Sequence, residues 1–145
     1  MTVAPRLIIF DCDGVLVDSE SFSCEAVEAC LAECGIGVTS HQVLDGYLGR
    51  SLAFLQLDVA SLFARTLPED FAAAMQQRVL ARFTAALQPI DGVAAAIDAL
   101  NCRVCVASSS QPKRIRYSLA LAGLLPRFDP HIFSAALGDP RQTGA

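Results

Sequence analysis

The sequence predicts an α/β fold in which a helical subdomain is inserted into a parallel-sheet core. Two short, continuous apolar runs, Leu7–Phe10 and Arg103–Ala107, are typical of strands buried on both faces of a parallel sheet. The interval 15–102 between them is far longer than the roughly twelve residues that a strand-helix-strand connection needs. Its apolar residues recur at helical spacing, which indicates an inserted group of helices.

The core is completed by one further helix and one further strand after the second apolar run. A helix is predicted from Pro112 to Leu121, because proline is favoured at the first helical position and Gly123 follows the last one. His131–Ser134 is a weaker candidate for a third strand.

The inserted subdomain is expected to span residues 18–88, between the core segments 1–17 and 89–145. Four helices are predicted in it, each from a start signal that is a capping residue, a capping box, or a proline followed by acids. These signals are Asp18 or Ser19, Thr39 with Gln42, Ser51, and Pro68 with Glu69 and Asp70. A short helix over Val93–Leu100 is expected to lead back into the sheet.

Composition argues against several classes of protein. The 145-residue chain is 53% hydrophobic with a net charge of −4, so it can form a core and has no basic stretch for nucleic acid. We expect no membrane partner, since no apolar segment approaches roughly 20 residues, and residues 1–10 lack a signal-peptide pattern. The six cysteines are expected to be free thiols in a reducing, cytoplasmic setting; they are Cys12, Cys24, Cys30, Cys34, Cys102 and Cys105.

Two acids follow the first predicted strand directly, in the run Asp11-Cys12-Asp13-Gly14. Side chains at i and i+2 share a side, and the carboxyl ends of parallel strands form the ligand crevice, so we expect both acids to face that crevice. A carboxylate beside Mg²⁺ can attack phosphorus and form an aspartyl phosphate, while a second acid supplies or removes the proton. The run therefore predicts magnesium-dependent phosphoryl transfer.

Three serines, Ser108-Ser109-Ser110, end the second predicted strand just before a helix. Their hydroxyls and the free backbone N–H groups of the helix start favour a bound phosphate. Adjacent parallel strands bring these serines and the two acids to one crevice. A phosphate-binding site is therefore expected beside the acids.

These motifs resemble those of the haloacid dehalogenase superfamily, in its phosphatase and phosphomutase branch. The stretch Leu7–Glu20, reading LIIFDCDGVLVDSE, is similar to the first motif of that family, and VCVASSSQP around Ser108 is similar to its second. The inserted helices resemble its small helical cap, and LDGYLGRS, which contains Arg50, resembles the substrate-specificity loop of that cap. The resemblance extends over nearly the whole chain and implies a Rossmann-like core.

The resemblance also implies a role for each matching residue. Asp11 is implied as the nucleophile and as a Mg²⁺ ligand, and Asp13 as the general acid/base that gives its backbone carbonyl to the metal. Ser108, with the amide of Ser109, is implied to hold the transferring phosphoryl group. Arg50 is implied to reach from the cap to the remote end of a small phosphorylated metabolite. The implied reaction is hydrolysis of a phosphoric monoester through an aspartyl phosphate.

Near its end the chain departs from the family pattern. The family next has a Lys that steadies the phosphoryl oxygens, where this chain has Asp139, and the two acids of a fourth motif have no counterpart. We therefore expect an incomplete core, from a truncated or frame-shifted reading, with Lys113 as a candidate substitute cation. Without the strand of the fourth motif, Leu7–Phe10 becomes an exposed edge, which predicts self-association.

Three alternatives to a phosphatase follow from the same residues. A sugar-phosphate mutase of the β-phosphoglucomutase type ranks lower, because Ser23 stands where those enzymes carry a cap histidine. A catalytically inert fragment is the second alternative. A phospho-receiver domain is the third, and it has no room for the insertion after the first strand.

Overall fold

The computed structural model describes residues 5–137, which divide into two compact units. Among the described residues, the sheet unit is formed by segments 5–18 and 87–137, and the helical unit by residues 19–86. Within the sheet unit, the two chain segments that lead to the helical unit run side by side, because the backbone N–H of Asp18 donates to the carbonyl of Gln88 at 3.0 Å.

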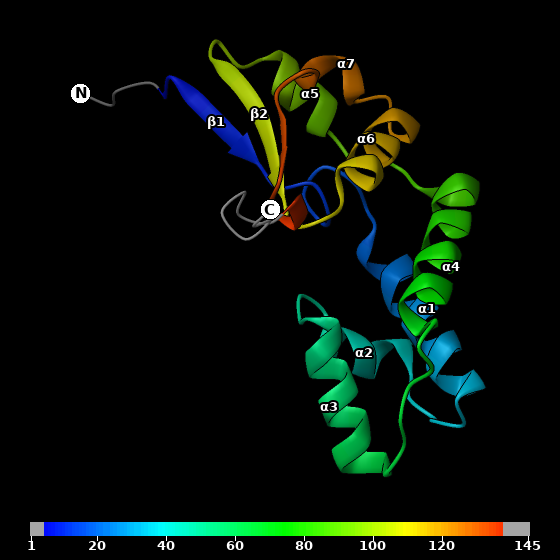
Figure 1. Ribbon diagram of the computed structural model, residues 1–145. Helices are drawn as coiled ribbons and strands as arrows, with labels where there is room; N and C mark the ends of the chain where they lie inside the picture. Colours follow the sequence, from blue (N-terminus) through cyan, green and yellow to red (C-terminus); the bar gives the residue numbers. More distant parts are fainter. Residues whose placement is uncertain (1–4, 138–145) are drawn as a thin grey trace. The chain divides into compact units, whose positions relative to one another are not determined.

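Within residues 5–137 the sheet has three parallel strands in the order β1-β2-β3 (Figure 1). They are β1 (Leu7–Phe10), β2 (Arg103–Ser108) and β3 (Ile132–Ser134), and all three were predicted from the sequence. The α/β class and the parallel pairing are thus confirmed.

In the described part of the chain, three α-helices accompany this sheet, α5 (Val93–Asp98), α6 (Pro112–Leu121) and α7 (Leu125–Phe128), and a short 3-10 helix (Ala135–Leu137) follows β3. Helix α6 has the bounds that its proline and its following glycine predict, and Gly123 adopts a φ of +68°. Helix α7 was not predicted, since four residues are too few to give a helical pattern. It nevertheless closes the core, because Phe128 packs edge-on against Phe10 with their ring centroids 5.8 Å apart.

One face of the sheet is covered and the other is largely open among the described residues. The prediction that β1 is buried on both faces is wrong for the open face, because Leu7 is 47% and Ile9 62% exposed. Phe133 in β3 is likewise 58% exposed. On the covered face, Val106 is completely buried. The strand order advances in one direction, so successive right-handed crossovers put their helices on the same face. Figure 1 shows α5, α6 and α7 together on one side of the strands.

The helical unit contains α1 (Glu20–Glu33), α2 (Ser40–Tyr47), α3 (Leu52–Phe63) and α4 (Phe71–Ala86). The predicted capping box is present: the Thr39 side chain accepts from the backbone N–H of Gln42, whose side chain accepts from the N–H of Thr39. Ser51 caps α3 as predicted, accepting from the N–H of Phe54 at 3.2 Å. Ser19 is the N-cap of α1, but its side chain makes no capping hydrogen bond.

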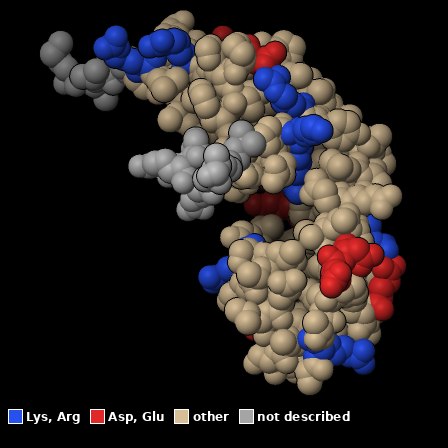
Figure 2. Space-filling view, viewed as in Figure 1, with Lys and Arg blue, Asp and Glu red and all other residues tan. Residues whose placement is uncertain are grey.

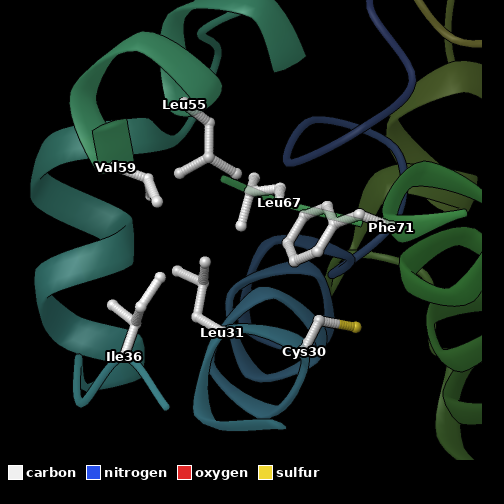
Figure 3. Close-up of a cluster of buried hydrophobic side chains, with 7 residues drawn as sticks. All are labelled: Cys30, Leu31, Ile36, Leu55, Val59, Leu67 and Phe71. Carbon is white, nitrogen blue, oxygen red and sulfur yellow. The ribbon is translucent and has the colours of Figure 1, made fainter. Parts of the chain in front are cut away.

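Part of the core of the helical unit is a cluster of buried side chains contributed by α1, α3, the first residue of α4 and the segments that precede α2 and α4 (Figure 3). Its members are Cys30, Leu31, Ile36, Leu55, Val59, Leu67 and Phe71. Two apolar residues of α3 lie outside this cluster, since Leu62 is 66% and Phe63 38% exposed. They occupy the last turn of the helix, where the chain turns away through Ala64 in a left-handed conformation.

Most of the surface drawn in Figure 2 is formed by uncharged residues, and Lys and Arg occur there in separate groups. No helix within residues 5–137 combines the length and the apolar character needed to cross a membrane.

The loop that follows β1 is anchored by Cys12, which is 1% exposed. The Cys12 carbonyl accepts from the backbone N–H of Val17 at 3.2 Å, and the N–H of Gly14, at a φ of +72°, donates to the Val17 carbonyl. Burial, followed by the carboxylates of Asp13 and Asp11, raises the pKa of the Cys12 thiol to about 12. The thiol is therefore neutral and enclosed at neutral pH.

We predict that Cys12 resists alkylation in the folded protein. At pH 8 a thiol with a pKa of about 12 is less than about one part in 1,000 thiolate, the form that reacts. The half-buried Cys34 and Cys102 should be labelled first by iodoacetamide, as peptide mass spectrometry would record. Labelling of Cys12 at the same rate as Cys102 in the folded protein would contradict this, and unfolding in urea should equalise the rates.

We also predict that the 145-residue chain self-associates through β1. Its backbone forms one edge of the described sheet, and its outward side chains are apolar. Replacement of Ile9 by Lys should lower the mass measured by light scattering after gel filtration. Replacement of Leu57, which is 72% exposed in the helical unit, by Lys changes the net charge equally and should leave that mass unchanged. A monodisperse monomer of the unaltered chain would refute the prediction.

Candidate active site

An open cavity of about 470 Å³ lies at the carboxyl ends of the three strands. The parallel register creates it: Phe10 pairs with Val106, and Ser108 pairs with Ser134. The residue after β1 therefore lies beside the end of β2, which in turn pairs with the end of β3. The cavity is lined by Asp11, Ala107, Ser108, Ser109, Phe133, Ser134 and Ala135.

Asp11 contributes an exposed carboxylate to this cavity. Its Oδ1 atom accepts from the backbone N–H of Cys12 at 2.7 Å, which orients the carboxylate. A carboxylate that is exposed and oriented in this way is suited to attack an electrophile that enters the cavity.

Ser108 and Ser109 line the same cavity, so the structure brings together three of the five predicted site residues. Ser108 is nearly buried at 7% exposure, and its Oγ accepts from the backbone N–H of Ser110 at 3.1 Å. Ser109 is exposed, and α6 begins three residues later at Pro112. Ser108 and Ser109 thus line the cavity together with Asp11, close to a helix start of the kind that favours a bound phosphate.

Asp13 makes its contacts away from that cavity lining. Its Oδ2 atom accepts from the Ser110 hydroxyl at 2.6 Å, and its Oδ1 atom accepts from Nη2 of Arg114 at 3.2 Å. The side chains of Asp13 and Arg114 are 28% and 17% exposed, so solvent screens this ion pair less than a surface pair. Both carboxylate oxygens of Asp13 are therefore held in place.

Sequence reasoning missed Arg114 and the role of Ser110. It considered Lys113 as a substitute cation, but Lys113 is exposed and Arg114 is the residue paired with an acid of the motif. A signal was available in the sequence, because Arg114 lies in the first turn of α6, where the helix dipole disfavours a cation. A basic residue at that position points to an acidic partner nearby.

Arg50 belongs to the helical unit, on the loop between α2 and α3. Its guanidinium lies over the ring of Phe54, 5.1 Å from the ring centroid, and Gly49 before it adopts a φ of +74°. The loop is anchored by the Tyr47 hydroxyl, which donates to Asp58 at 2.5 Å and whose pKa is thereby raised to about 12. The role of Arg50 at the substrate stays a prediction.

The two acids of the motif offer hard oxygen ligands of the kind that magnesium prefers. Magnesium is commonly held by one or two carboxylates together with water and substrate phosphate, and Asp11 with the main-chain carbonyl of Asp13 matches that pattern. Residues 5–137 contain no group of three or more His, Cys, Asp and Glu side chains placed to hold a metal together. Asp139, which replaces the family's Lys, lies outside the described residues.

Comparisons of the sequence and of the fold with known proteins all indicate the same family. The family model of haloacid dehalogenase-like hydrolases matches residues 5–141. The 6-phosphogluconate phosphatase of Escherichia coli is 30% identical over 129 residues, which are 88% of this chain and 58% of that protein.

Two solved structures resemble the chain in fold and sequence. A conserved haloacid dehalogenase-like protein of Agrobacterium tumefaciens has a TM-score of 0.83 at 34% identity, over 94% of this chain and 62% of that one. A haloacid dehalogenase family hydrolase of Deinococcus radiodurans, solved with bound phosphate and sodium, has a TM-score of 0.72 at 26% identity, over 91% and 58%. The chain thus spans about three fifths of the length of these relatives, and it belongs to the haloacid dehalogenase-like hydrolases.

Proposed function

We propose that this protein hydrolyses a small phosphorylated metabolite through a covalent aspartyl phosphate, with Mg²⁺ as cofactor. The observation that carries the proposal is the shared cavity in which the Asp11 carboxylate meets Ser108 and Ser109. Membership of a hydrolase family and the phosphatase relative support the same reaction class. The six free thiols fit a reducing, cytoplasmic setting.

The proposed reaction has two steps. In the first, an oxygen of the Asp11 carboxylate attacks phosphorus while the ester P–O bond breaks, and Asp13 donates a proton to the departing alcohol oxygen. In the second, Asp13 takes a proton from water as that water attacks the aspartyl phosphate, which releases inorganic phosphate and restores Asp11. Ser108 and the Ser109 N–H bind the phosphoryl oxygens in both steps.

Asp11 and the backbone carbonyl of Asp13 are the groups that would hold magnesium. When bound, magnesium offsets the repulsion between the carboxylate and the phosphate oxygens.

Arg50 and the phosphatase relative support the substrate class that we propose. The helical unit is proposed to act as a cap that carries Arg50 toward the end of the substrate remote from the phosphate. The Escherichia coli relative is named for 6-phosphogluconate, a sugar phosphate whose other end is a carboxylate. A guanidinium pairs well with a carboxylate, so we propose a phosphorylated sugar acid as the substrate.

Hydrolysis is favoured over a mutase reaction. Ser23 stands where the mutases carry a histidine, and its hydroxyl donates to the backbone carbonyl of Ser19 in its own helix at 3.0 Å. A serine hydroxyl that donates within its own helix does not replace the histidine as a proton-transfer group.

Replacement of Asp11 by Asn should abolish Mg²⁺-dependent release of p-nitrophenol from p-nitrophenyl phosphate, by about 1,000-fold or more, because the nucleophile is lost. The exposed Asp91, in the same unit, provides a control with the same change of charge, and Asp91→Asn should retain turnover. An unaltered chain that is folded but inactive would favour the inert fragment. Equal activity of Asp11→Asn and the unaltered chain would exclude the covalent mechanism.

Replacement of Arg50 by Ala should raise the KM for 6-phosphogluconate about tenfold, the equivalent of one charge-assisted hydrogen bond. The same variant should show a smaller rise in KM for glucose 6-phosphate, whose remote end is uncharged. Steady-state kinetics on the two substrates make the comparison within one protein. An equal rise for both would contradict recognition of a carboxylate by Arg50.

A further inference from the structure

We propose that Arg114 is a positioning residue for Asp13, the acid that exchanges protons in the proposed reaction. The inference rests on that proposed function and deepens it. It concerns a residue of α6 that belongs to neither of the two sequence motifs at the strand ends.

The geometry holds Asp13 from two sides. Nη2 of Arg114 donates to Oδ1 of Asp13 at 3.2 Å, and the Ser110 hydroxyl donates to Oδ2 at 2.6 Å. A carboxylate bound through both oxygens has a fixed plane as well as a fixed position, whereas a single hydrogen bond leaves it free to rotate. Arg114 thereby helps to fix the orientation in which the Asp13 carboxyl group takes up and releases a proton in the proposed reaction.

The Ser110 anchor is itself fixed by the sheet. Its backbone N–H donates to Oγ of Ser108 at 3.1 Å, and its carbonyl accepts from the Ser134 hydroxyl at 2.6 Å. The end of β3 therefore supports Ser110, and Ser110 supports Asp13. Arg114 completes this chain of contacts from the helix side.

The location of Arg114 carries an energetic cost that a surface role does not explain. It is the third residue of α6, and a cation in the first turn opposes the helix dipole. Its side chain is only 17% exposed, so its charge is mostly removed from water. The Asp13 carboxylate offsets both effects. The Arg114 guanidinium in turn restricts the movement of that carboxylate.

A test must separate positioning of a proton donor from simple stabilisation. An aryl phosphate releases a phenolate that departs without a proton, whereas an alkyl phosphate releases an alkoxide that needs one from a general acid. A displaced Asp13 therefore harms alkyl-ester cleavage more than aryl-ester cleavage. The value of kcat/KM is the right measure, since it reports the first irreversible step.

The experiment uses the full chain with Arg114→Gln and its conservative counterpart Arg114→Lys. The Gln variant should lower kcat/KM by about 100-fold for 6-phosphogluconate and by less than about 10-fold for p-nitrophenyl phosphate. The Lys variant should recover part of the loss on 6-phosphogluconate. The control is Arg116→Gln on the same helix, which removes an ion pair to Asp129 at the surface and should change both substrates by less than about twofold.

A second variant, Ser110→Ala, keeps the proposal testable when Arg114→Gln fails to fold, because it removes the other hydrogen bond to Asp13. It should give the same preferential loss on the alkyl ester. Equal losses on both esters in these variants would overturn the positioning role while leaving the phosphatase intact. Absence of turnover on either ester by the unaltered, folded chain would overturn the proposed function, and the role of Arg114 with it.

Discussion

Parallel pairing of β1 with β2 is the contact on which the rest of the sheet unit depends. It joins Leu7–Phe10 to Arg103–Val106, two segments separated by the whole helical unit. The register decides that Asp11 emerges next to Ser108, and that one cavity holds a carboxylate and several hydrogen-bond donors. Two local motifs, neither of which is a site alone, become one site through this pairing.

Charge is the second constraint. Two carboxylates on one tight loop repel each other, and burial of Cys12 between them keeps that loop partly out of water. Arg114 relieves the repulsion, although its place in the first turn of α6 is unfavourable for the helix. Arg114 thus occupies an unfavourable position in α6 and holds Asp13 near Asp11, the proposed nucleophile, a pattern found where function opposes local preference.

The elements that could be predicted are those set by neighbours in the chain. Thr39 with Gln42 predicted a helix start because both hydrogen bonds of the capping box lie within four residues. Pro112 and Gly123 marked the ends of α6 for the same reason. Exposure could not be read in this way: Ile9 and Leu62 are apolar, yet what covers them depends on segments distant in sequence.

The sequence by itself determined the family and the order of the main elements, and it predicted the chemistry that we propose for the Asp11 and Ser108 motifs, since these depend on residue types at short spacing. Only the tertiary structure decided which groups surround Asp13. Arg114 and Ser110 reach its two oxygens because β2 and α6 return the chain about one hundred residues later to the end of β1. Side-chain contacts of that range depend on register and helix placement, and a cation in the first turn of α6 indicates an acidic partner without identifying it.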